Sequence, residues 1–575
     1  MLIFDFEVFM YDWLVIFKDV ASQEYTIIIN NKEELLKFYE ENKKKIWIGY
    51  NNKSYDNTIL AGILSNVDPY TISTMIVKET PIYSIYKLLQ IKKLELISMD
   101  LMQDVLGMSL KEAEGYMNMS VEESSIPFDI ERKLTENEIK ETIKYCRHDV
   151  DATEQLLHYR ESYISAKMNL CKLFNISLDN LDKTNAGLVG IVLDAHKKDR
   201  DDELIYDLPK EVVINNPKYR KILDLYIGHE LNYENKMTID IAGVPHILAY
   251  GGIHAAKDNF FYKGEMWHID VNSFYPSLMI QYNFHSRNIK DPQKFIDIYN
   301  KRIEAKKAGN KTLAGTLKLV INTTYGCMKS KYSSLYDPKM ANQVCITGQL
   351  LFVDLIEKLE PYITLIQSNT DGIIVIPHNK DKIKEIVTEW ENRTRMTVGI
   401  DIYTKIYQKD VNNYIIEDDK GNIEVKGGYV SQFYQNEKDA ELRNTSRILD
   451  FAIVNYFLYG IKPEETIFTC NDKSMFQIIT KTGGTYDSTY WKSSTGTKLV
   501  NKVNRVFASK NKLHGNLYKS KQVTKKTGET VTQYDSIASL PEHCIVDNKN
   551  SLLINAIDKQ WYVDMAYKKI NDFKE

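Results

Sequence analysis

The feature that most constrains the fold is a pair of apolar, β-branched runs in residues 362–377, separated by Ser-Asn-Thr-Asp-Gly. Asp-Gly between such runs is a strong signal for a β-hairpin. We expect the hairpin to hold Asp371 at its tip, and an Asp chosen only for turn chemistry is the ordinary alternative.

Residues 267–278 predict a strand that carries Asp270 toward a break at Tyr275-Pro276, since the residue before a proline favours extended geometry. The proline suits the first position of a following helix.

Two carboxylates that face each other suggest metal chemistry. Asp270 and Asp371 could hold two divalent ions about 3.5–4 Å apart, which stabilise the attacking and leaving oxygens of an in-line phosphoryl transfer. Mg²⁺ suits such a site because it binds through carboxylates, phosphates and water.

A third stretch has Lys318, Asn322 and Tyr325 at i, i+4 and i+7, on one helix face. It ends in poor helix formers, which favours a site over a solvated face.

These stretches resemble motifs A, B and C of family B DNA polymerases, most closely the small bacteriophage branch that includes the protein-primed enzymes. Asp-Val-Asn-Ser-Phe-Tyr-Pro matches motif A, Lys-x-x-x-Asn-x-x-Tyr-Gly matches motif B, and Asn-Thr-Asp-Gly stands where motif C has Asp-Thr-Asp-Ser. The resemblance implies that Asp270 and Asp371 are the metal-binding catalytic pair. It also implies nucleotide-binding residues: Tyr275 as the steric gate against ribonucleotides, Lys318 at the triphosphate, Asn322 and Tyr325 in the nucleotide pocket, and Lys306 as a second basic residue.

The N-terminal part carries three pairs of polar residues on predicted elements. Residues 2–8 predict a strand with Asp5 and Glu7 on one face, and residues 11–17 predict its antiparallel partner. Two such acids are costly unless they bind a metal or a partner, or face solvent at an edge. The other pairs are Asn52 with Asp56, after a predicted strand, and Tyr145 with Asp149, on a helix whose capping box runs from Thr135 to Glu138. Alone, an Asx turn and a polar helix face explain these two pairs.

Together, the three pairs resemble the Exo motifs of the DnaQ-like 3′–5′ proofreading domain, and they precede the polymerase motifs as in family B. The resemblance implies that two metals are held by four carboxylates, those of Asp5, Glu7, Asp56 and Asp149. It implies that Tyr145 positions the nucleophile and that Asn52 contacts single-stranded DNA. Ser109-Leu110 resembles a further single-strand-binding motif. The Lys that follows it in the phage enzymes would fall near Glu122-Glu123, so that role stays unassigned.

Two further stretches resemble DNA-binding motifs of the same family. Tyr250, Gly251 and Gly252 resemble the Tyr-x-Gly-Gly/Ala loop that holds the template, and a plain glycine turn is the alternative. Lys426 and Tyr429 resemble the Lys-x-Tyr motif that holds the primer, with one extra Gly between them and a β-turn as the alternative.

The net charge is −4, so the overall charge does not indicate nucleic-acid binding, and any such role must come from local basic patches. Residues 488–528 contain no Asp or Glu and interleave Lys and Arg with aromatic residues, a pattern typical of nucleic-acid contact, although a solvated basic face is the usual alternative. The six cysteines form no Cys-x-x-Cys, which indicates reduced thiols. No apolar run reaches membrane-spanning length and the N-terminus lacks a signal-peptide pattern, so we expect a cytoplasmic protein.

A chain of 575 residues needs more than one core, so we expect a multidomain α/β and α+β protein. The resemblance implies an RNase H-like exonuclease domain followed by a right-hand polymerase domain of palm, fingers and thumb. The expected parts are the exonuclease domain at 1–160, a linker at 161–240, palm at 241–287 (motif A), fingers at 288–335 (motif B), palm at 336–435 (motif C), and thumb with a C-terminal DNA-binding subdomain at 436–575.

The function implied is a template-directed DNA polymerase with 3′–5′ proofreading, replicative in a phage or mobile element inside a bacterial cytoplasm. Two Mg²⁺ or Mn²⁺ ions per active site, primer-template DNA, dNTPs and phage replication accessory proteins are the implied cofactors and partners. The short spacings between motifs lack the large insertions of protein-primed members, which argues against protein priming and unaided strand displacement. The alternatives are a 3′–5′ exonuclease with a degenerate polymerase half, suggested by Asn369 in motif C, and a DNA-binding accessory protein. Since Asp371 is the direct ligand in the family, we expect activity to survive Asn369.

Overall fold

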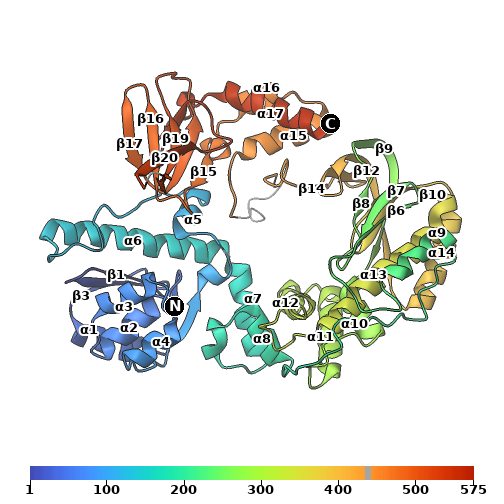
Figure 1. Cartoon of the computed structure of the whole chain (residues 1–575), viewed down its shortest axis with the longest axis horizontal. Coiled ribbons are helices and arrows are strands. Elements are labelled where there is room, and N and C mark those ends of the chain that lie inside the picture. The colour runs from blue at the N-terminus through green and yellow to red at the C-terminus, as the bar shows by residue number, and fades with distance from the viewer. Residues whose placement is uncertain (106, 434–441, 527, 575) are drawn as a thin grey trace. The chain divides into compact units, whose positions relative to one another are not determined.

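The computed structural model describes residues 1–105, 107–433, 442–526 and 528–574 of the chain. The fold is mixed α/β, and the chain divides into two structural units. Unit 1 combines Met1–Thr184, Tyr434–Leu449 and Glu464–Asp564, and unit 2 combines Asn185–Phe433, Asp450–Pro463 and Met565–Glu575. Each unit is therefore built from segments that lie far apart in the sequence (Figure 1).

The N-terminal sheet of unit 1 has the strand order β3-β2-β1-β4-β5. Its strands are β1 (Leu2–Val8), β2 (Trp13–Asp19), β3 (Tyr25–Ile29), β4 (Ile46–Gly49) and β5 (Ile97–Asp100). β1 pairs antiparallel with β2 and parallel with β4, so it lies in the middle of the sheet. The strand predicted over residues 2–8 is confirmed, and its antiparallel partner begins two residues later than expected.

Helices cover both faces of this sheet (Figure 1). One face is covered by α1 (Lys32–Asn42), α2 (Asp56–Leu64), α3 (Pro69–Val77) and α4 (Ile82–Leu88), and the other by α6 (Glu136–Tyr159). α5 (Leu110–Tyr116) and α7 (Glu161–Leu173) pack against α6. Phe4 and Phe6 point from β1 into an apolar core shared with α1–α4. Because side chains alternate along a strand, Asp5 and Glu7 point to the opposite face, where α6 packs on β1 and β2.

The C-terminal part of unit 1 is built mainly of strands, in sheets with the orders β15-β18-β21 and β17-β16-β19-β20. The strands are β15 (Ile478–Lys481), β16 (Ser488–Ser493), β17 (Gly496–Val500), β18 (Val503–Ala508), β19 (Asn516–Thr524), β20 (Thr530–Ser536) and β21 (Cys544–Val546). Val506, Leu517 and Cys544 form a core between these sheets. α16 (Pro463–Thr469) precedes the strands. α15 (Arg447–Tyr459) and α17 (Lys559–Lys574) contribute several residues to each unit.

The main sheet of unit 2 has the order β14-β13-β12-β9-β11-β10-β8. Its strands are β8 (Ala255–Ala256), β9 (Phe260–Val271), β10 (Ile363–Ser368), β11 (Gly372–Pro377), β12 (Val398–Asp410), β13 (Asn413–Asp418) and β14 (Ile423–Lys426). The hairpin predicted over residues 362–377 is confirmed as β10 and β11. β9 lies between β11 and β12 and pairs antiparallel with both. β6 (Met237–Ile241) and β7 (Val244–Leu248) form a separate hairpin.

The turn of the β10–β11 hairpin differs from the turn that Asp-Gly usually forms. A type I′ turn needs positive φ at both central residues, but no residue from 369 to 372, all of which are described, has positive φ. Gly372 serves a different purpose, because a Cβ there would lie 2.8 Å from His268 Nε2 and 3.1 Å from Ile269 O. The missing side chain therefore allows β11 to approach β9 closely.

The helices of unit 2 are α8 (Asn185–Val192), α9 (Pro217–Arg220), α10 (Phe274–Gln281), α11 (Pro292–Lys307), α12 (Lys311–Cys327), α13 (Pro338–Leu359) and α14 (Lys380–Thr394). α11 and α12 pack together as a helical hairpin within the residues expected as fingers, and Asp291 caps α11 by accepting the Gln293 N–H. α10 begins at Phe274 rather than at Pro276, because Ser273 adopts a left-handed conformation and turns the chain earlier. Within the described residues, the structure contains no helix with the length and apolarity of a membrane span.

Candidate active sites

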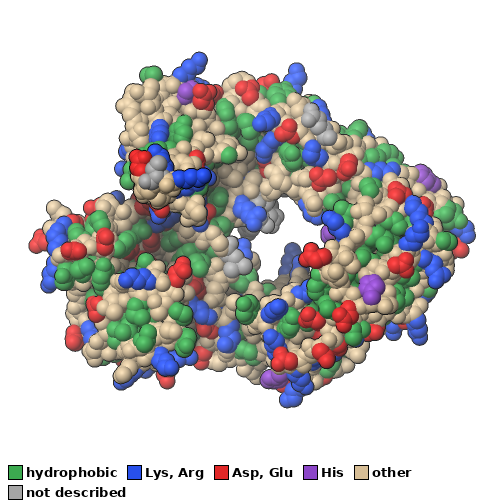
Figure 2. Space-filling model, in the orientation of Figure 1, with side chains coloured by type: hydrophobic (Ala, Val, Ile, Leu, Met, Phe, Trp, Pro, Cys, Tyr) green, Lys and Arg blue, Asp and Glu red, His purple; other side chains and the backbone are tan. Residues whose placement is uncertain are grey.

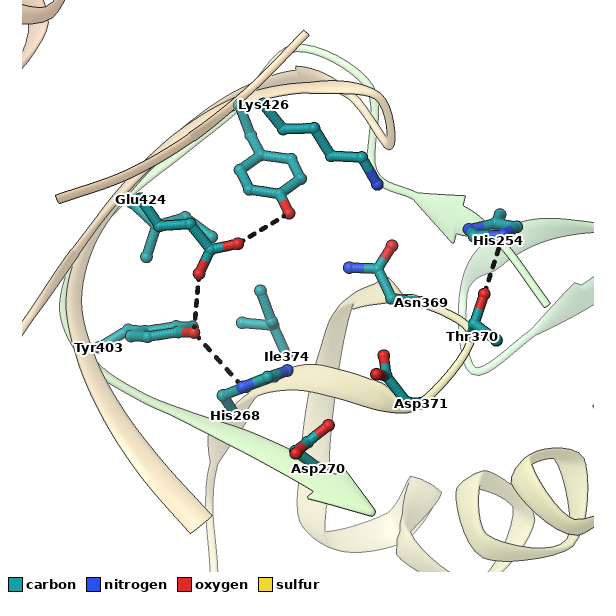
Figure 3. Close-up of a pocket in the computed structure, with 12 residues that line it drawn as sticks. His254, His268, Asp270, Asn369, Thr370, Asp371, Ile374, Tyr403, Glu424 and Lys426 are labelled. Carbon is teal, nitrogen blue, oxygen red and sulfur yellow. Dashed lines mark hydrogen bonds between the residues drawn. The ribbon is translucent and has the colours of Figure 1, made fainter. Parts of the chain in front are cut away.

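In unit 2, Asp270 and Asp371 lie beside each other at one end of the main sheet (Figure 3). Asp270 is the penultimate residue of β9, and its cross-strand partner on β11 is Gly372. Asp371 precedes that glycine, at the hairpin tip. The Val271 N–H donates to Asp371 O at 2.7 Å and holds the tip against β9. The strand register thus brings the two predicted carboxylates together.

The electrostatics of this centre favour a cation. Burial, followed by the charges of Asp371 and Asp401, raises the pKa of Asp270 to about 7. In the described part of the chain, no Lys or Arg forms an ion pair with Asp270 or Asp371. Oxygen ligands with uncompensated negative charge fit Mg²⁺ or Mn²⁺, so the residues present are suited to the divalent ions that the motifs imply.

A pocket of about 310 Å³ opens above the two carboxylates. Its polar lining is connected: the hydroxyls of Tyr403 and Tyr414 donate to the Glu424 carboxylate at 3.3 and 3.1 Å, and Tyr403 Oη lies 3.3 Å from His268 Nδ1 (Figure 3). Burial lowers the pKa of His268 and raises those of both tyrosines. Lys426, predicted from its motif, also lines the pocket.

Sequence reasoning assigned no role to His268 or Glu424, although a signal was present. Each lies two residues before a predicted site residue on the same strand, Asp270 and Lys426 respectively. Side chains two apart on a strand share a face, so period-two spacing could have placed both in this pocket. Tyr403 carries no comparable signal, because only the pairing of β12 with β9 brings it near His268.

The predicted helix face of the third motif is present on α12. Lys318 and Asn322 are exposed, whereas Leu317 and Ile321, each one position earlier on the helix, are buried. Tyr325 meets Tyr275 from α10, with ring centroids 4.5 Å apart. The structure therefore links the helix face to the residue predicted as a steric gate. Lys306 is exposed in the last turn of α11 and does not line the pocket.

The Tyr250-Gly-Gly turn lies against the hairpin tip. A Cβ on Gly252 would lie 2.2 Å from Thr370 Oγ1, so only glycine allows this approach. Gln349 donates to Gly251 O at 2.7 Å, and Tyr250 packs edge-on against Tyr233. The predicted turn is thus next to Asp371. Tyr429 lies elsewhere, because its ring packs with Phe573 at 5.8 Å in an apolar cluster.

In unit 1, four predicted carboxylates gather between β1, α2 and α6. Asp5 and Glu7 project from β1, and Asp149 comes from α6, whose predicted capping box at Thr135 is present. Asp56 opens α2 and accepts the Phe6 N–H at 2.9 Å. Burial raises the pKa of all four, to about 7 for Asp56 and to about 6 for Asp149. For Asp5 and Glu7 the charges of neighbouring site carboxylates raise the pKa further.

Lys111 completes this centre and was not predicted. It forms ion pairs with Asp149 and, at 3.0 Å, with Glu114, and its ammonium lies 4.5 Å from the centroid of the Tyr145 ring. Burial alone would lower the pKa of Lys111, but these carboxylates raise it overall. The sequence signal was the capping box of Ser109 with Glu112, which begins α5 and places Lys111 in its first turn.

Asn52 occupies a different environment from the four carboxylates. It is fully buried and donates to Ser98 Oγ at 2.9 Å, so its amide supports the turn after β4. Ser109 caps α5. Carboxylates without enough cations to neutralise them are again suited to divalent ions, and Asp5, Glu7 and Cys146 have ligand atoms within 4.8 Å of one another.

The acid-free stretch 488–528 forms much of the sheet β17-β16-β19-β20. Aromatic and basic side chains alternate on it: Lys492 lies over the rings of Tyr518 and Tyr534 at 5.2 and 3.2 Å. Pairing with β20 also brings in an acid, because Asp535 lies opposite Lys519. Figure 2 shows Lys and Arg side chains with Asp or Glu among them over these strands. The patch is basic and aromatic, but less purely basic than the linear sequence.

Comparisons with known proteins give little beyond this geometry. No family model matches the sequence, and no curated protein does. Among solved structures, the chain is similar to the family B DNA polymerase from the hyperthermophilic archaeon Pyrobaculum calidifontis, with 14% identity and a TM-score of 0.43 over 100% of this chain and 77% of that chain. A likeness of this size leaves the function to be argued from the residues of the two centres.

Proposed function

We propose that this chain is a template-directed DNA polymerase of family B with a 3′–5′ proofreading exonuclease. The observation that carries the proposal is the pairing of β9 with β11, which brings Asp270 beside Asp371 under a pocket that also contains Lys426. The motif residues Tyr275 and Tyr325 are in ring contact in the same unit. A carboxylate pair, a basic helix face and aromatic walls are what nucleotidyl transfer needs.

In synthesis, the primer 3′-hydroxyl attacks the α-phosphate of a dNTP, the new O–P bond forms, and pyrophosphate leaves. Asp270 and Asp371 would hold two Mg²⁺ or Mn²⁺ ions. When bound, such ions stabilise the attacking and leaving oxygens. Lys318 would balance the charge of the triphosphate, and Tyr275 would lie against the sugar, where a 2′-hydroxyl has no room.

In proofreading, the last phosphodiester of the primer would be hydrolysed at the unit 1 centre. Asp5, Glu7, Asp56 and Asp149 would hold the ions, and Tyr145 would orient the attacking water. Lys111 would balance the charge of Asp149 and Glu114 and fix the position of Tyr145 through its ring. The motif resemblance to the small phage branch further suggests a replicative enzyme of a phage or mobile element, which acts on primer-template DNA in a bacterial cytoplasm with phage accessory proteins.

One observation favours a second candidate, a 3′–5′ exonuclease with an inactive polymerase half. Asn369 replaces a carboxylate at the hairpin tip and faces the pocket without adding charge (Figure 3). The first experiment therefore uses a labelled primer on a longer template with Mg²⁺, with and without the four dNTPs. Asp371→Asn and Asp149→Asn are the matched variants, since each removes one charge from one centre.

The proposed function requires extension with dNTPs and shortening without them. It also requires that Asp371→Asn abolish extension while shortening continues, and that Asp149→Asn do the reverse. Shortening under both conditions by the wild-type chain would favour the nuclease candidate. Neither extension nor shortening would contradict both candidates and leave a DNA-binding role.

A further inference from the structure

Cys146 lies inside the acidic centre of unit 1, although none of the motifs includes it. It follows Tyr145 on α6 and is fully buried. Its thiol donates to Asp5 O at 3.4 Å and to Asp5 Oδ2 at 3.5 Å. The sulfur and one carboxylate oxygen each from Asp5 and Glu7 lie within 4.8 Å of one another. Three potential ligand atoms from two elements therefore converge on one point.

Glu7 supplies an independent sign that this point is suited to a cation. It is only 5% exposed, yet no described residue donates a hydrogen bond to its carboxylate or forms an ion pair with it. A buried carboxylate without such partners is costly. The charge of Lys111 lowers the pKa of Glu7, but its ammonium forms its ion pairs with Asp149 and Glu114, and the pKa of Glu7 is still raised overall.

A structural role for Cys146 explains less. Buried cysteines usually behave as small apolar side chains among apolar neighbours. Cys171 on α7, also buried in unit 1, belongs to no such group of carboxylates among the residues that the structure describes. Cys146 instead borders two acids.

We propose that Cys146, Asp5 and Glu7 form a site that selects a thiophilic divalent cation, Zn²⁺ in particular, over Mg²⁺. Zn²⁺ accepts thiolate and carboxylate ligands in a tetrahedral arrangement, whereas Mg²⁺ prefers oxygen ligands in an octahedral one. On binding, the thiol proton passes to solvent as the metal–sulfur bond forms. The pocket of unit 2 is lined by no cysteine, so the preference is confined to unit 1.

The proposal shares its residues with the proposed exonuclease centre, and it predicts regulation there. Zn²⁺ held by the Cys146 thiolate and the carboxylates of Asp5 and Glu7 would occupy ligands that hydrolysis requires. Zn²⁺ should therefore inhibit primer shortening in the presence of excess Mg²⁺ and leave extension unaffected.

The test is direct metal binding to the full chain, stripped of metal with a chelator and kept reduced. Co²⁺ serves as the spectroscopic probe for Zn²⁺, since a thiolate ligand gives a sulfur-to-cobalt charge-transfer band in the near ultraviolet. We expect the band in the wild type and in Cys171→Ser, and its loss in Cys146→Ser. Zn²⁺ titrated against a competing chromophoric chelator should bind about tenfold or more weakly to Cys146→Ser, which corresponds to about 1.4 kcal/mol or more.

A second variant guards against a folding defect at position 146. Glu7→Gln keeps the thiol and removes one ligand, so it should retain a charge-transfer band and weaken Zn²⁺ binding. Absence of the band in the wild type, or its persistence in Cys146→Ser, would overturn the proposal. Since cobalt binding needs no catalysis, a chain that gives the band but never shortens DNA would refute only the exonuclease. A chain that shortens DNA with Mg²⁺ but gives no band would refute only the Zn²⁺ site.

Discussion

Lys111 shows that a role left unassigned by a sequence motif can be filled by a residue that only helix packing brings to the site. The family pattern put the expected lysine near Glu122-Glu123, so the role stayed unassigned. In the structure α5 packs on α6, and Lys111 reaches Asp149 across that contact. The position of a side chain across two helices depends on how they pack, which spacing along the chain does not specify.

We expect Lys111→Met to slow primer shortening by about tenfold or more, a loss of about 1.4 kcal/mol in transition-state stabilisation. Lys111 opposes the effect of burial on Asp149, whose pKa is about 6. Without the ammonium that pKa rises, so more of the carboxyl is protonated and unable to bind metal near neutral pH. The defect should therefore shrink as pH rises, measured as shortening rates over a pH series.

Lys45→Met is the matched control, since Lys45 is exposed and pairs with Asp19 at the surface of the same unit. It should leave the rate unchanged at every pH. An equal defect at all pH values in Lys111→Met would contradict the electrostatic explanation and point to lost packing on Tyr145.

His246 should make unit 2 less stable in acid. It is fully buried between Val244 O and Ser368 Oγ, and burial lowers its pKa from 6.5 to about 4. The unfolded chain therefore takes up a proton at a higher pH than the folded chain, and stability falls as pH drops from about 7 to about 4. At pH 5 this proton uptake lowers the free energy of unfolding by about 2 kcal/mol.

The measurement for His246 is the melting temperature at pH 7 and pH 5. His246→Gln removes the titrating group, so its melting temperature should be lower at pH 7 but should fall less between the two values. A variant with the same pH dependence as the wild type would show that other groups govern acid stability.

At the scale of elements, the register of β9 with β11 decides the unit 2 centre. A shift of one residue would turn Asp270 to the other face of the sheet. The hairpin signal was read correctly, and the structure adds what Gly372 does: it permits close approach to β9 and has no positive φ. Turn chemistry is local, whereas interstrand distance depends on a strand far away in the chain.

We expect Gly372→Ala to abolish most extension. Its Cβ would meet Ile269 O at 3.1 Å, so β11 must move away from β9 and carry Asp371 with it. A misplacement of about 1 Å can cost about 100-fold in rate. Overpacking should also destabilise unit 2 by about 2 kcal/mol. Extension rates and melting curves check both effects.

Gly315→Ala is the matched control on α12, because a Cβ there meets nothing within 4 Å. Alanine in place of glycine in a helix interior should raise the free energy of unfolding by about 0.5–1 kcal/mol and leave primer extension intact. If Gly372→Ala extended primers as fast as Gly315→Ala, the close approach of β11 to β9 would not matter for catalysis.

At the scale of the whole molecule, unit 1 joins the N-terminal sheet to strands near the C-terminus. Arg505 on β18 is fully buried and donates to Gly115 O at 3.2 Å and to Met119 O at 2.6 Å. Gln477 also donates to Gly115 O. These hydrogen bonds join residues of the expected parts 1–160 and 436–575 within unit 1. The boundary at Thr184 falls inside the expected linker 161–240.

We expect Arg505→Met to destabilise unit 1 by about 2 kcal/mol, because Met119 O loses its donor in a partly buried setting. Amide hydrogen exchange should accelerate on α5, which contacts β15 and β18. Lys510→Met, at an exposed position of the same stretch, should leave exchange unchanged. Unchanged exchange in Arg505→Met would mean that the two segments fold independently.

The sequence by itself determined the local features: the strand of residues 2–8, the capping box at Thr135 and the hairpin of residues 362–377. These depend on neighbours within a few residues, so period and turn chemistry suffice. It also identified the carboxylates that the fold gathers into two centres. Only the tertiary structure decided that Lys111, Cys146 and Glu424 join those centres. It also decided that Asn52 is buried and that Asp535 lies opposite Lys519 and partly offsets the positive charge of residues 488–528. Such contacts depend on strand register and helix packing between distant segments, which no local pattern encodes.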